Sequence, residues 1–348
     1  MSGPFHARKL LRELDRLGRR ISPLLILTHD NPDPDALAAA WALAFLAHGV
    51  AKVRCRIVYG GAIGRQENRI MAERLKIPAR PLRQGELDAA EHVALVDTQP
   101  PFRNNRFPPR RRPLLIIDHH ARHPDTTAEL AIIDENAGAT ATILAEALQL
   151  SGLRVPRRLA TAVVYGIGSE TQNLGREAGL RDLVAYRAFW PRANVKSLWR
   201  MSYPRRQAGY FADLARAIRG AFVCHGVVGT HLGTVDIPEH VAQIADFLMT
   251  YERAHWSIVT GRCQGSLLVS LRTDDPGAAA GSLLKRLFWG GNRGGGHAMI
   301  AGGAIAVGAL ASESKWRESE DRLLTAFLES QDLTGAALTH PFWNAPTR

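Results

Sequence analysis

The chain has 348 residues, 46% of them hydrophobic and 22% charged; this is the balance of an ordinary soluble globular protein, and the length suggests two domains. Lysine and arginine outnumber aspartate and glutamate by 44 to 33, which favours a polyanionic partner such as nucleic acid or a nucleotide, although scattered arginines can also reflect coding bias. The three cysteines form no CxxC pair, which argues against a disulfide framework and for a reduced, cytoplasmic compartment. The sequence shows neither a signal-peptide core nor an apolar run of about 20 residues, so we expect no membrane association.

Strands and helices alternate through the first half of the chain. Apolar runs predict strands over 24–28, 53–59, 93–96 and 114–117. Helices are predicted over 5–19, 36–48, 66–75, 139–150 and 156–165, and again over 184–190 and 206–218. The alternation favours a doubly wound α/β domain with a mostly parallel sheet, which we assign to residues 1–195.

The pattern changes near residue 220. Strands are predicted over 221–234, 256–261, 266–271 and 300–307, and helices over 238–252, 277–288 and 314–330. A glycine-dense loop is expected at 290–297. This order predicts a smaller α+β domain over 220–335, with a linker region at 196–219.

Acidic and histidine side chains follow three of the predicted strands directly. The run at 114–117 stops at Asp118, His119 and His120, which alone is nearly as compatible with an ordinary surface loop. The pattern recurs, however: His29, Asp33 and Asp35 follow the first strand, and Asp97 follows the third. Because the carboxyl ends of parallel strands share one edge of a sheet, these groups are expected to converge there. Carboxylates and imidazoles are costly to bury without a cation, so the pattern predicts a divalent-metal site.

Several short segments occur in a characteristic order along the chain. They are HDNPDPDA at 29–36, Asp97-Thr98, Asp118-His119-His120, GIGSET at 166–171, SLRT at 270–273 and GGGH at 294–297. In this order they resemble the motifs of the DHH phosphoesterase superfamily, and within it the group that joins a DHH domain to a DHHA1 domain. The resemblance covers nearly the whole chain. One position departs from the pattern, because the fourth motif usually has aspartate where this chain has Glu170.

The resemblance implies two divalent metal ions, with Mn²⁺ favoured and Mg²⁺ as the alternative. It implies His29, Asp33 and Asp97 as ligands of the first ion. It implies Asp35, Asp97, His119 and Glu170 as ligands of the second ion, with Asp97 bridging. Glutamate keeps the charge of aspartate but is one methylene longer, so the metal position at Glu170 is expected to differ.

Two further residues of the third motif are assigned supporting roles. Asp118 is expected to orient an imidazole, although a cap at the end of the strand is an equally good interpretation. His120 is then expected to donate a hydrogen bond to the scissile phosphate or the leaving group. Asp30 is expected to face solvent.

The second domain carries the candidate substrate-binding residues. Gly294, Gly295 and Gly296 would let backbone N–H groups approach a phosphate, and His297 could stack on a base or bond to a phosphate. Arg272, with Thr273, would hold a phosphate through its guanidinium. A glycine loop alone would be interpreted as a tight turn, and it is Arg272 that favours binding. A phosphate grip at a fixed distance from the metals predicts short substrates.

The resemblance implies a metal-dependent phosphodiesterase that hydrolyses short RNA or DNA oligonucleotides or dinucleotides to nucleoside monophosphates. Alternatives within the group are a 3′-phosphoadenosine 5′-phosphate phosphatase and a cyclic-dinucleotide phosphodiesterase. GGGH argues against pyrophosphatases and polyphosphatases, which have a different second domain. An alternative of another class is a non-catalytic nucleotide sensor in which Glu170 marks a degenerate metal site. A homodimer is compatible with the sequence, which does not determine the oligomeric state.

Overall fold

The computed structural model describes residues 3–102, 104–108, 110–175, 178–289, 293–296 and 298–342. The chain divides into two compact units, Met1–Pro204 and Arg205–Arg348. The division falls inside the interval 196–219 in which we expected a linker. Most of that interval is helical, because α8 (Val195–Ser202) lies in the first unit and α9 (Ala208–Gly220) in the second.

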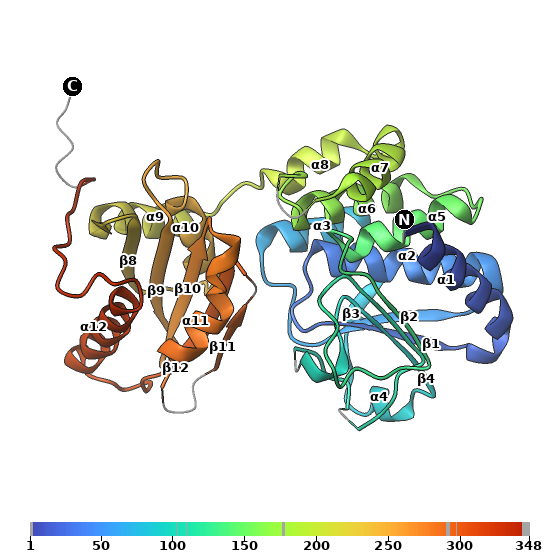
Figure 1. Ribbon diagram of the computed structural model, residues 1–348, viewed down its shortest axis with the longest axis horizontal. Helices are drawn as coiled ribbons and strands as arrows, with labels where there is room; N and C mark the ends of the chain where they lie inside the picture. Colours follow the sequence, from blue (N-terminus) through green and yellow to red (C-terminus); the bar gives the residue numbers. More distant parts are fainter. Residues whose placement is uncertain are drawn as a thin grey trace. The chain divides into compact units, whose positions relative to one another are not determined.

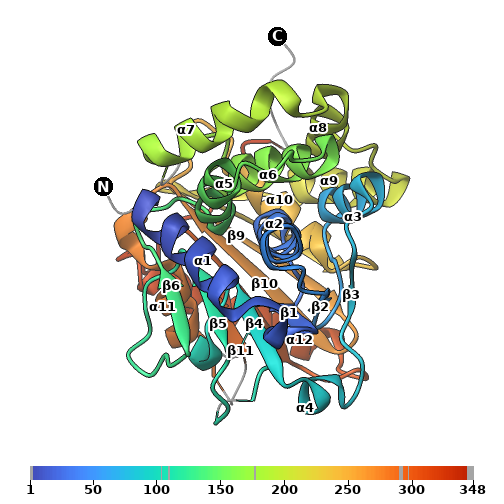
Figure 2. The same ribbon diagram turned by 90° about the vertical axis from the view of Figure 1, so that its right-hand side faces the viewer.

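The first unit (Figure 1) is built on a parallel sheet of six strands, sheet A, in the order β3-β2-β1-β4-β5-β6, which are labelled in Figure 2. Its strands are β1 (Leu24–Thr28), β2 (Cys55–Tyr59), β3 (Ala79–Pro81), β4 (His92–Val96), β5 (Leu115–Asp118) and β6 (Leu130–Ile133). Its other helices are α1 (Gly3–Leu17), α2 (Pro34–Ala51), α3 (Gln66–Leu75), α4 (Glu86–Ala89), α5 (Thr140–Leu150), α6 (Arg157–Glu170) and α7 (Leu180–Phe189). Every strand pairing in this sheet is parallel, as the alternation of strands and helices predicted.

Both faces of sheet A are covered, which explains why its strands are apolar on both sides. Leu24 and Ile26 of β1 belong to a large core with residues of α1, α2, α5 and α6, whereas Leu25 and Leu27 belong to a smaller core that includes Leu87 of α4. Figure 2 shows α6 on the side of α2 that faces away from the sheet. Helix α2 is long and apolar enough to cross a membrane by length and composition alone, but 67% of it is buried inside the structure.

The second unit is built on a mixed sheet, sheet B, in the order β11-β12-β10-β9-β8-β7. Its strands are β7 (Phe222–Cys224), β8 (Val227–Thr234), β9 (Trp256–Cys263), β10 (Ser266–Thr273), β11 (Arg293–Gly296) and β12 (Ile300–Ala306). Its other helices are α10 (Glu239–Leu248), α11 (Ala280–Leu287) and α12 (Glu313–Glu329). One core joins the sheet to α11 and α12, and another joins it to α9 and α10. The two sheets confirm the predicted fold class.

The remaining helical segments are single turns of 3₁₀ helix at Gly18–Ile21, Pro100–Phe102, Trp190–Arg192 and Pro276–Ala278. Helix α8 was not predicted. The short elements β3, α4 and β6 were also not predicted, because each offers too few residues to show a period. The prediction was wrong in two places that concern the site. Helix α6 extends through residues 166–170, beyond the predicted end at residue 165, and Gly294–Gly296, predicted as a loop, lie in strand β11, which pairs with β12.

Candidate metal centre

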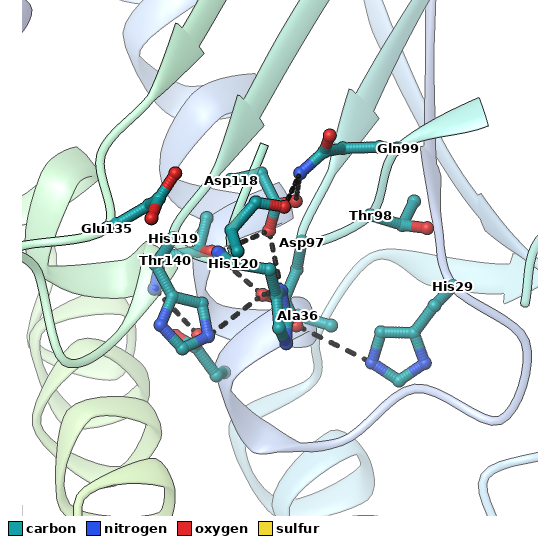
Figure 3. Close-up of polar contacts among 12 residues, drawn as sticks. His29, Ala36, Asp97, Thr98, Gln99, Asp118, His119, His120, Glu135 and Thr140 are labelled. Atoms are coloured by element: carbon teal, nitrogen blue, oxygen red, sulfur yellow. Dashed lines mark hydrogen bonds and ion pairs between the residues drawn. The ribbon is translucent and has the colours of Figure 1, made fainter. Parts of the chain in front are cut away.

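Three neighbouring strands of sheet A deliver the predicted residues to one edge. β1, β4 and β5 are adjacent and parallel, with Thr28 beside Val96 and Val96 beside Ile117. His29, Asp97 and the Asp118-His119-His120 segment therefore begin at nearly the same level of the sheet, and Figure 3 shows their side chains turned toward one another. The strand-end argument made from the sequence thus holds in the structure.

The first group of ligand-type atoms comes from His29, Asp33 and Asp97, whose atoms lie within 4.8 Å of one another. His29 Nε2 is 3.5 Å from Asp97 Oδ2 and 3.8 Å from Asp33 Oδ2. Asp33 caps helix α2, since its Oδ1 accepts a hydrogen bond of 2.9 Å from the Ala36 N–H. The cap fixes this carboxylate, and its Oδ2 is the oxygen directed at His29. These are the three residues expected around the first ion.

The second group consists of Asp97, His119 and His120, again with ligand-type atoms within 4.8 Å. Asp97 Oδ1 lies 3.7 Å from His119 Nε2 and 3.8 Å from His120 Nδ1. The Asp97 carboxylate, 2% exposed as a residue, therefore belongs to both groups. Its backbone has a φ of 61°, a left-handed conformation that aspartate tolerates better than most residues. A carboxylate shared in this way could contact a cation held by either group.

His29 and His119, which both direct Nε2 at Asp97, are held in the same way. His29 Nδ1 is 2.9 Å from the Asp30 carbonyl and His119 Nδ1 is 3.3 Å from the Ala137 carbonyl. A carbonyl oxygen only accepts, so each Nδ1 carries the proton, and a neutral ring then has its lone pair on Nε2. Histidines that bind metals are commonly oriented by such a hydrogen bond from the second nitrogen. His119 Nε2 is buried and has no hydrogen-bond partner among the described residues.

Asp35 lies beside these groups but is held differently. It is fully buried in the first turn of α2, and its two oxygens accept hydrogen bonds of 2.7 Å each from the Thr140 and Ala141 N–H groups at the start of α5. The Thr140 hydroxyl donates to Asp97 Oδ1 over 2.7 Å (Figure 3). The N-terminus of α5 therefore fixes two carboxylates of the centre. Asp35 lies outside both close groups of ligand atoms.

Glu170 is the last residue of α6 and is partly buried. It also lies outside the two close groups, but its charge reaches the centre, since it raises the pKa values of Asp35 and His120. Helix α6 has little freedom to shift toward the site. A Cβ at Gly166 would lie 2.9 Å from Ala38 Cβ and 3.0 Å from the Pro34 carbonyl oxygen, so the two helices touch at this glycine.

Asp118 holds the ring of His120. The Asp118 carboxylate is fully buried, and its Oδ1 accepts a hydrogen bond of 2.7 Å from His120 Nδ1. Its Oδ2 accepts one of 2.7 Å from Gln99 Nε2. Gln99 is itself fixed, because its Oε1 accepts hydrogen bonds from His123 and Thr126. Of the two interpretations of Asp118, this geometry favours the orientation of an imidazole.

The pKa values of Asp35, Asp97 and His120 are shifted by burial and by the charges of their neighbours. Burial and the charges of Asp97, Asp33 and Glu170 raise the pKa of Asp35 well above its usual range. Burial raises the pKa of Asp97 as well, but hydrogen bonding to His29 and the charges of three histidines lower it overall. Burial lowers the pKa of His120, yet hydrogen bonding to Asp118 and nearby carboxylates raise it to about 9. A cation between these groups would compensate the same excess charge.

The donor set fits divalent ions that prefer oxygen and imidazole. Four acidic residues, Asp33, Asp35, Asp97 and Glu170, contribute to one electrostatic cluster with His29, His119 and His120. No cysteine is among them, which disfavours thiolate-preferring ions. The buried, unpartnered Nε2 of His119 is the clearest sign that a ligand belongs there.

Three residues that organise the centre were not found from the sequence. Gln99 and Thr140 hold Asp118, Asp35 and Asp97 as described. Asp182, fully buried in α7, accepts hydrogen bonds from the Gly138 N–H, the Thr142 hydroxyl and the Gly179 N–H, and so fixes the segment that leads into α5. A threonine at the second position of the predicted helix 139–150 could have suggested Thr140, but nothing local marks Gln99 or Asp182.

The expectation that Asp30 faces solvent was wrong. Its side chain is 21% exposed, and its Oδ2 lies 3.1 Å from Arg106 Nε. Its Oδ1 is buried without a hydrogen-bond partner among the described residues. A Cβ at Gly60 would lie 1.8 Å from that oxygen, so glycine is needed at this position to admit the Asp30 carboxylate.

The candidate substrate residues of the second unit gather at one end of sheet B. Leu271 pairs with Ala301, which pairs with Gly296, so Arg272, Thr273 and the end of β11 are close to one another. The Arg272 side chain is buried: its Nε binds Asp246, and its Nη1 donates to Ser270 Oγ over 2.7 Å and to the Leu271 carbonyl over 2.8 Å. Thr273 is also buried, and its Oγ1 accepts a hydrogen bond from the Asp275 N–H.

The glycines of β11 have a packing role in this structure. A Cβ at Gly296 would lie 2.0 Å from the Ile300 carbonyl oxygen, and one at Gly294 would lie 2.8 Å from the Phe288 ring. Among the described residues, a Cβ at Gly295 would meet only Lys285 Cε, at 3.7 Å. The structural interpretation therefore accounts for two of the three glycines. His297 lies outside the described residues.

Comparison with known proteins finds similarity that includes most of the first unit. Residues 23–167 match the model of the family described as "DHH family, N-terminal domain". An uncharacterized protein of Methanocaldococcus jannaschii is 33% identical over 296 residues, which are 84% of this chain and 60% of that protein. A probable manganese-dependent inorganic pyrophosphatase of Streptococcus equi subsp. zooepidemicus is 26% identical over 161 residues, 43% of this chain and 49% of that protein. The chain thus spans about half to three fifths of the length of these relatives.

Solved structures show the same fold at low sequence identity. An exopolyphosphatase-related protein from Bacteroides fragilis superposes with a TM-score of 0.69 at 13% identity, over 91% of this chain and 96% of that one. RecJ from Thermus thermophilus, solved in complex with Mn²⁺, gives a TM-score of 0.53 at 14% identity, over 94% of this chain and 55% of that one. These likenesses concern the fold, not the substrate.

Proposed function

Because the chain carries the N-terminal domain of the DHH family, we propose that it is a metal-dependent phosphodiesterase that hydrolyses short oligonucleotides or dinucleotides to nucleoside monophosphates. The observation that carries this proposal is the position of Asp97. His29 directs Nε2 at one Asp97 oxygen, and His119 directs Nε2 at the other. Each ring is fixed by a hydrogen bond from Nδ1 to a backbone carbonyl. This arrangement suits a pair of cations that share one carboxylate.

We assign His29, Asp33 and Asp97 to one ion and Asp97 with His119 to the other, and Asp35 and Glu170 complete the second set. Bound there, two divalent ions would polarise a phosphoryl oxygen and stabilise the leaving oxygen. We favour Mn²⁺ over Mg²⁺, because nitrogen ligands suit it better and because the pyrophosphatase relative is named manganese-dependent.

The protein's own residues prepare the phosphate position. Asp118 fixes His120 through Nδ1, so that the other side of the ring can face a phosphoryl group and donate a hydrogen bond to it. Gln99 holds Asp118 from the opposite side, and both are buried, which excludes water from this contact. The hydrogen bonds from α5 keep the Asp35 and Asp97 carboxylates in place without a ligand, so little reorganisation is needed when a substrate arrives.

The preference for short substrates rests on the second unit. We propose that Arg272, Thr273 and β11 with His297 receive a second phosphate of the substrate. The clustering of Arg272, Thr273 and Gly296 at one end of sheet B supports this proposal. Arg272 is bonded to Asp246 in this structure, so the phosphate would have to replace or join that carboxylate.

A second candidate is hydrolysis of pyrophosphate or short polyphosphate. The similarity to a pyrophosphatase over 161 residues favours it, and so does the name of the Bacteroides fragilis protein, whose fold matches 91% of this chain. The fold therefore does not support the argument that GGGH excludes this class of substrate. Both candidates use the same metal centre, and they differ in what the second unit must recognise.

The test is a panel of substrates assayed with added Mn²⁺ or Mg²⁺, on the order of tens of micromolar. It would contain pApA, RNA of about 5 and about 20 nucleotides, cyclic di-AMP, phosphoadenosine phosphate and pyrophosphate, so that the length of the substrate and the type of phosphate bond both vary. We expect fastest turnover of pApA, and loss of turnover in the Asp118→Ala/His119→Ala variant. Preferred turnover of pyrophosphate would replace the proposal by the second candidate. Binding of nucleotides without any turnover would favour a sensor.

A further inference from the structure

A cleft of about 540 Å³ lies on the first unit between helices α3, α6 and α8. Its lining includes Arg74, Arg157, Arg158, Thr161, Asn194 and Ser197. It opens at the N-terminus of α6, whereas Glu170 of the metal centre is the last residue of the same helix. A helix of 14 residues is roughly 20 Å long, so this cleft is separate from the metal centre.

The positive charge of the cleft is not balanced by an acidic residue in its lining. Its lining contains three arginines and no acidic residue. Arg157 and Arg158 are exposed, and neither has an ion pair with any of the described residues. They occupy the first two positions of α6, whose first turn has no acidic residue and whose N-cap, Pro156, provides no side-chain hydrogen bond. Positive charges at a helix N-terminus oppose the helix dipole, so an anion placed between them would be stabilised by both.

The walls of the cleft are fixed before any ligand arrives. Arg74 Nε donates to Ser197 Oγ over 3.0 Å, which joins α3 to α8. Thr161 Oγ1 accepts a hydrogen bond of 2.9 Å from the Asn194 N–H, which joins α6 to the start of α8. Asn194 in turn caps α8 by accepting from the Ser197 N–H. A preformed cavity has little ordering cost on binding.

We propose that this cleft is a second anion site, which binds a small molecule carrying two or more phosphate groups. Guanidinium groups make bidentate contacts with phosphate, and three of them match a diphosphate better than a single monoanion. The volume lies within the roughly 300–1,000 Å³ of pockets that hold small molecules, so either inorganic pyrophosphate or the diphosphate of a nucleotide fits the chemistry. This site does not depend on the proposed hydrolytic activity.

The test is isothermal titration of the full-length protein with pyrophosphate, and separately with ADP, in the presence of a chelator so that the metal centre contributes no turnover. The test variant is Arg157→Gln/Arg158→Gln. The matched control is Arg8→Gln/Arg187→Gln, which removes the same charge from exposed positions on α1 and α7 that do not line the cleft. Melting temperatures of both variants check that they are folded, and Arg74→Gln provides a second variant.

We expect the Kd for pyrophosphate to rise about tenfold or more in Arg157→Gln/Arg158→Gln and in Arg74→Gln, because a lost hydrogen bond to a charged group lowers affinity by about that factor. In the control we expect a rise of less than about twofold. If the Kd for ADP rises in the same variants, the cleft recognises the phosphate groups of the ligand. Equal binding by wild type and the cleft variants would overturn the proposal. An equal loss in the control would also overturn it, because binding would then reflect net charge alone.

Discussion

The carboxyl edge of sheet A and the Arg272 end of sheet B differ in whether their polar groups are satisfied. At the edge of sheet A, carboxylates crowd together and His119 Nε2 is buried without a partner among the described residues. At the end of sheet B, Arg272 is bonded to Asp246, Ser270 and main-chain carbonyls. The first region is arranged for an incoming cation. The second is internally satisfied, so a substrate there must compete with existing contacts.

The largest effect should come from Asp97, because it belongs to both groups of ligand atoms. Asp97→Asn keeps the shape but removes the charge, and we expect the rate of hydrolysis to fall by about 10³-fold or more. Bound Mn²⁺, measured by elemental analysis after gel filtration, should fall with it. Asp125→Asn, at an exposed carboxylate of the same unit, is the control and should retain rate and metal. Retained activity in Asp97→Asn would place the reaction elsewhere.

Asp118→Asn tests the positioning of His120. The amide cannot hold His120 Nδ1–H and Gln99 Nε2–H as the carboxylate does, so the ring loses its fixed orientation. Loss of such a supporting contact typically costs roughly 10–100-fold. We expect kcat to fall by this factor while KM and metal content stay near wild type. A variant that loses its metal instead would show that Asp118 supports the ligands and not His120.

Glu170→Asp tests whether the centre is built for glutamate. Shortening the side chain withdraws the carboxylate by one C–C bond, about 1.5 Å, and the contact of Gly166 with Ala38 and Pro34 prevents α6 from moving closer. We expect activity to fall about tenfold, since misplacement by an ångström can cost more than that. Glu170→Gln is the comparison variant and should lose more. Higher activity in Glu170→Asp would mean that glutamate misplaces the metal in this chain.

Two glycines of α6 should respond in opposite directions. Gly166→Ala places a methyl group against α2, and we expect the free energy of unfolding to fall by about 1–3 kcal/mol. At Gly168 a Cβ would have only ordinary contacts at 3.5 Å, so alanine should raise helix stability by roughly 0.5–1 kcal/mol. Chemical denaturation followed by circular dichroism measures both. Equal effects would contradict the close contact between α6 and α2.

The smallest effect concerns β11 and separates packing from binding. Gly295→Ala should change the free energy of unfolding by less than about 0.5 kcal/mol, because the added methyl meets only Lys285. Gly296→Ala should destabilise the second unit, since its Cβ would overlap the Ile300 carbonyl oxygen. If Gly295→Ala stays folded but raises KM for pApA, the backbone of β11 contacts substrate. An unchanged KM would leave packing as the explanation for these glycines.

The sequence was enough to predict those site residues that directly follow a strand of the parallel sheet. His29, Asp97 and His119 follow apolar runs directly, and parallel strands bring such residues to one edge. Gln99, Thr140 and Asp182 could not be found in this way, because each acts through a partner distant in the sequence. Two predictions that rested on residue type alone were wrong. Asp30 is partly buried by its pairing with Arg106, and the glycine run pairs as a strand.

The most direct test of the metal centre is X-ray diffraction from crystals grown with Mn²⁺, measured at wavelengths on both sides of the manganese absorption edge. The arrangement of His29, Asp33, Asp97 and His119 predicts two anomalous peaks, one between Asp97 and His29 and one between Asp97 and His119. A crystal saturated with Mn²⁺ that shows no peak beside Asp97 would contradict the account, whatever activity the protein has.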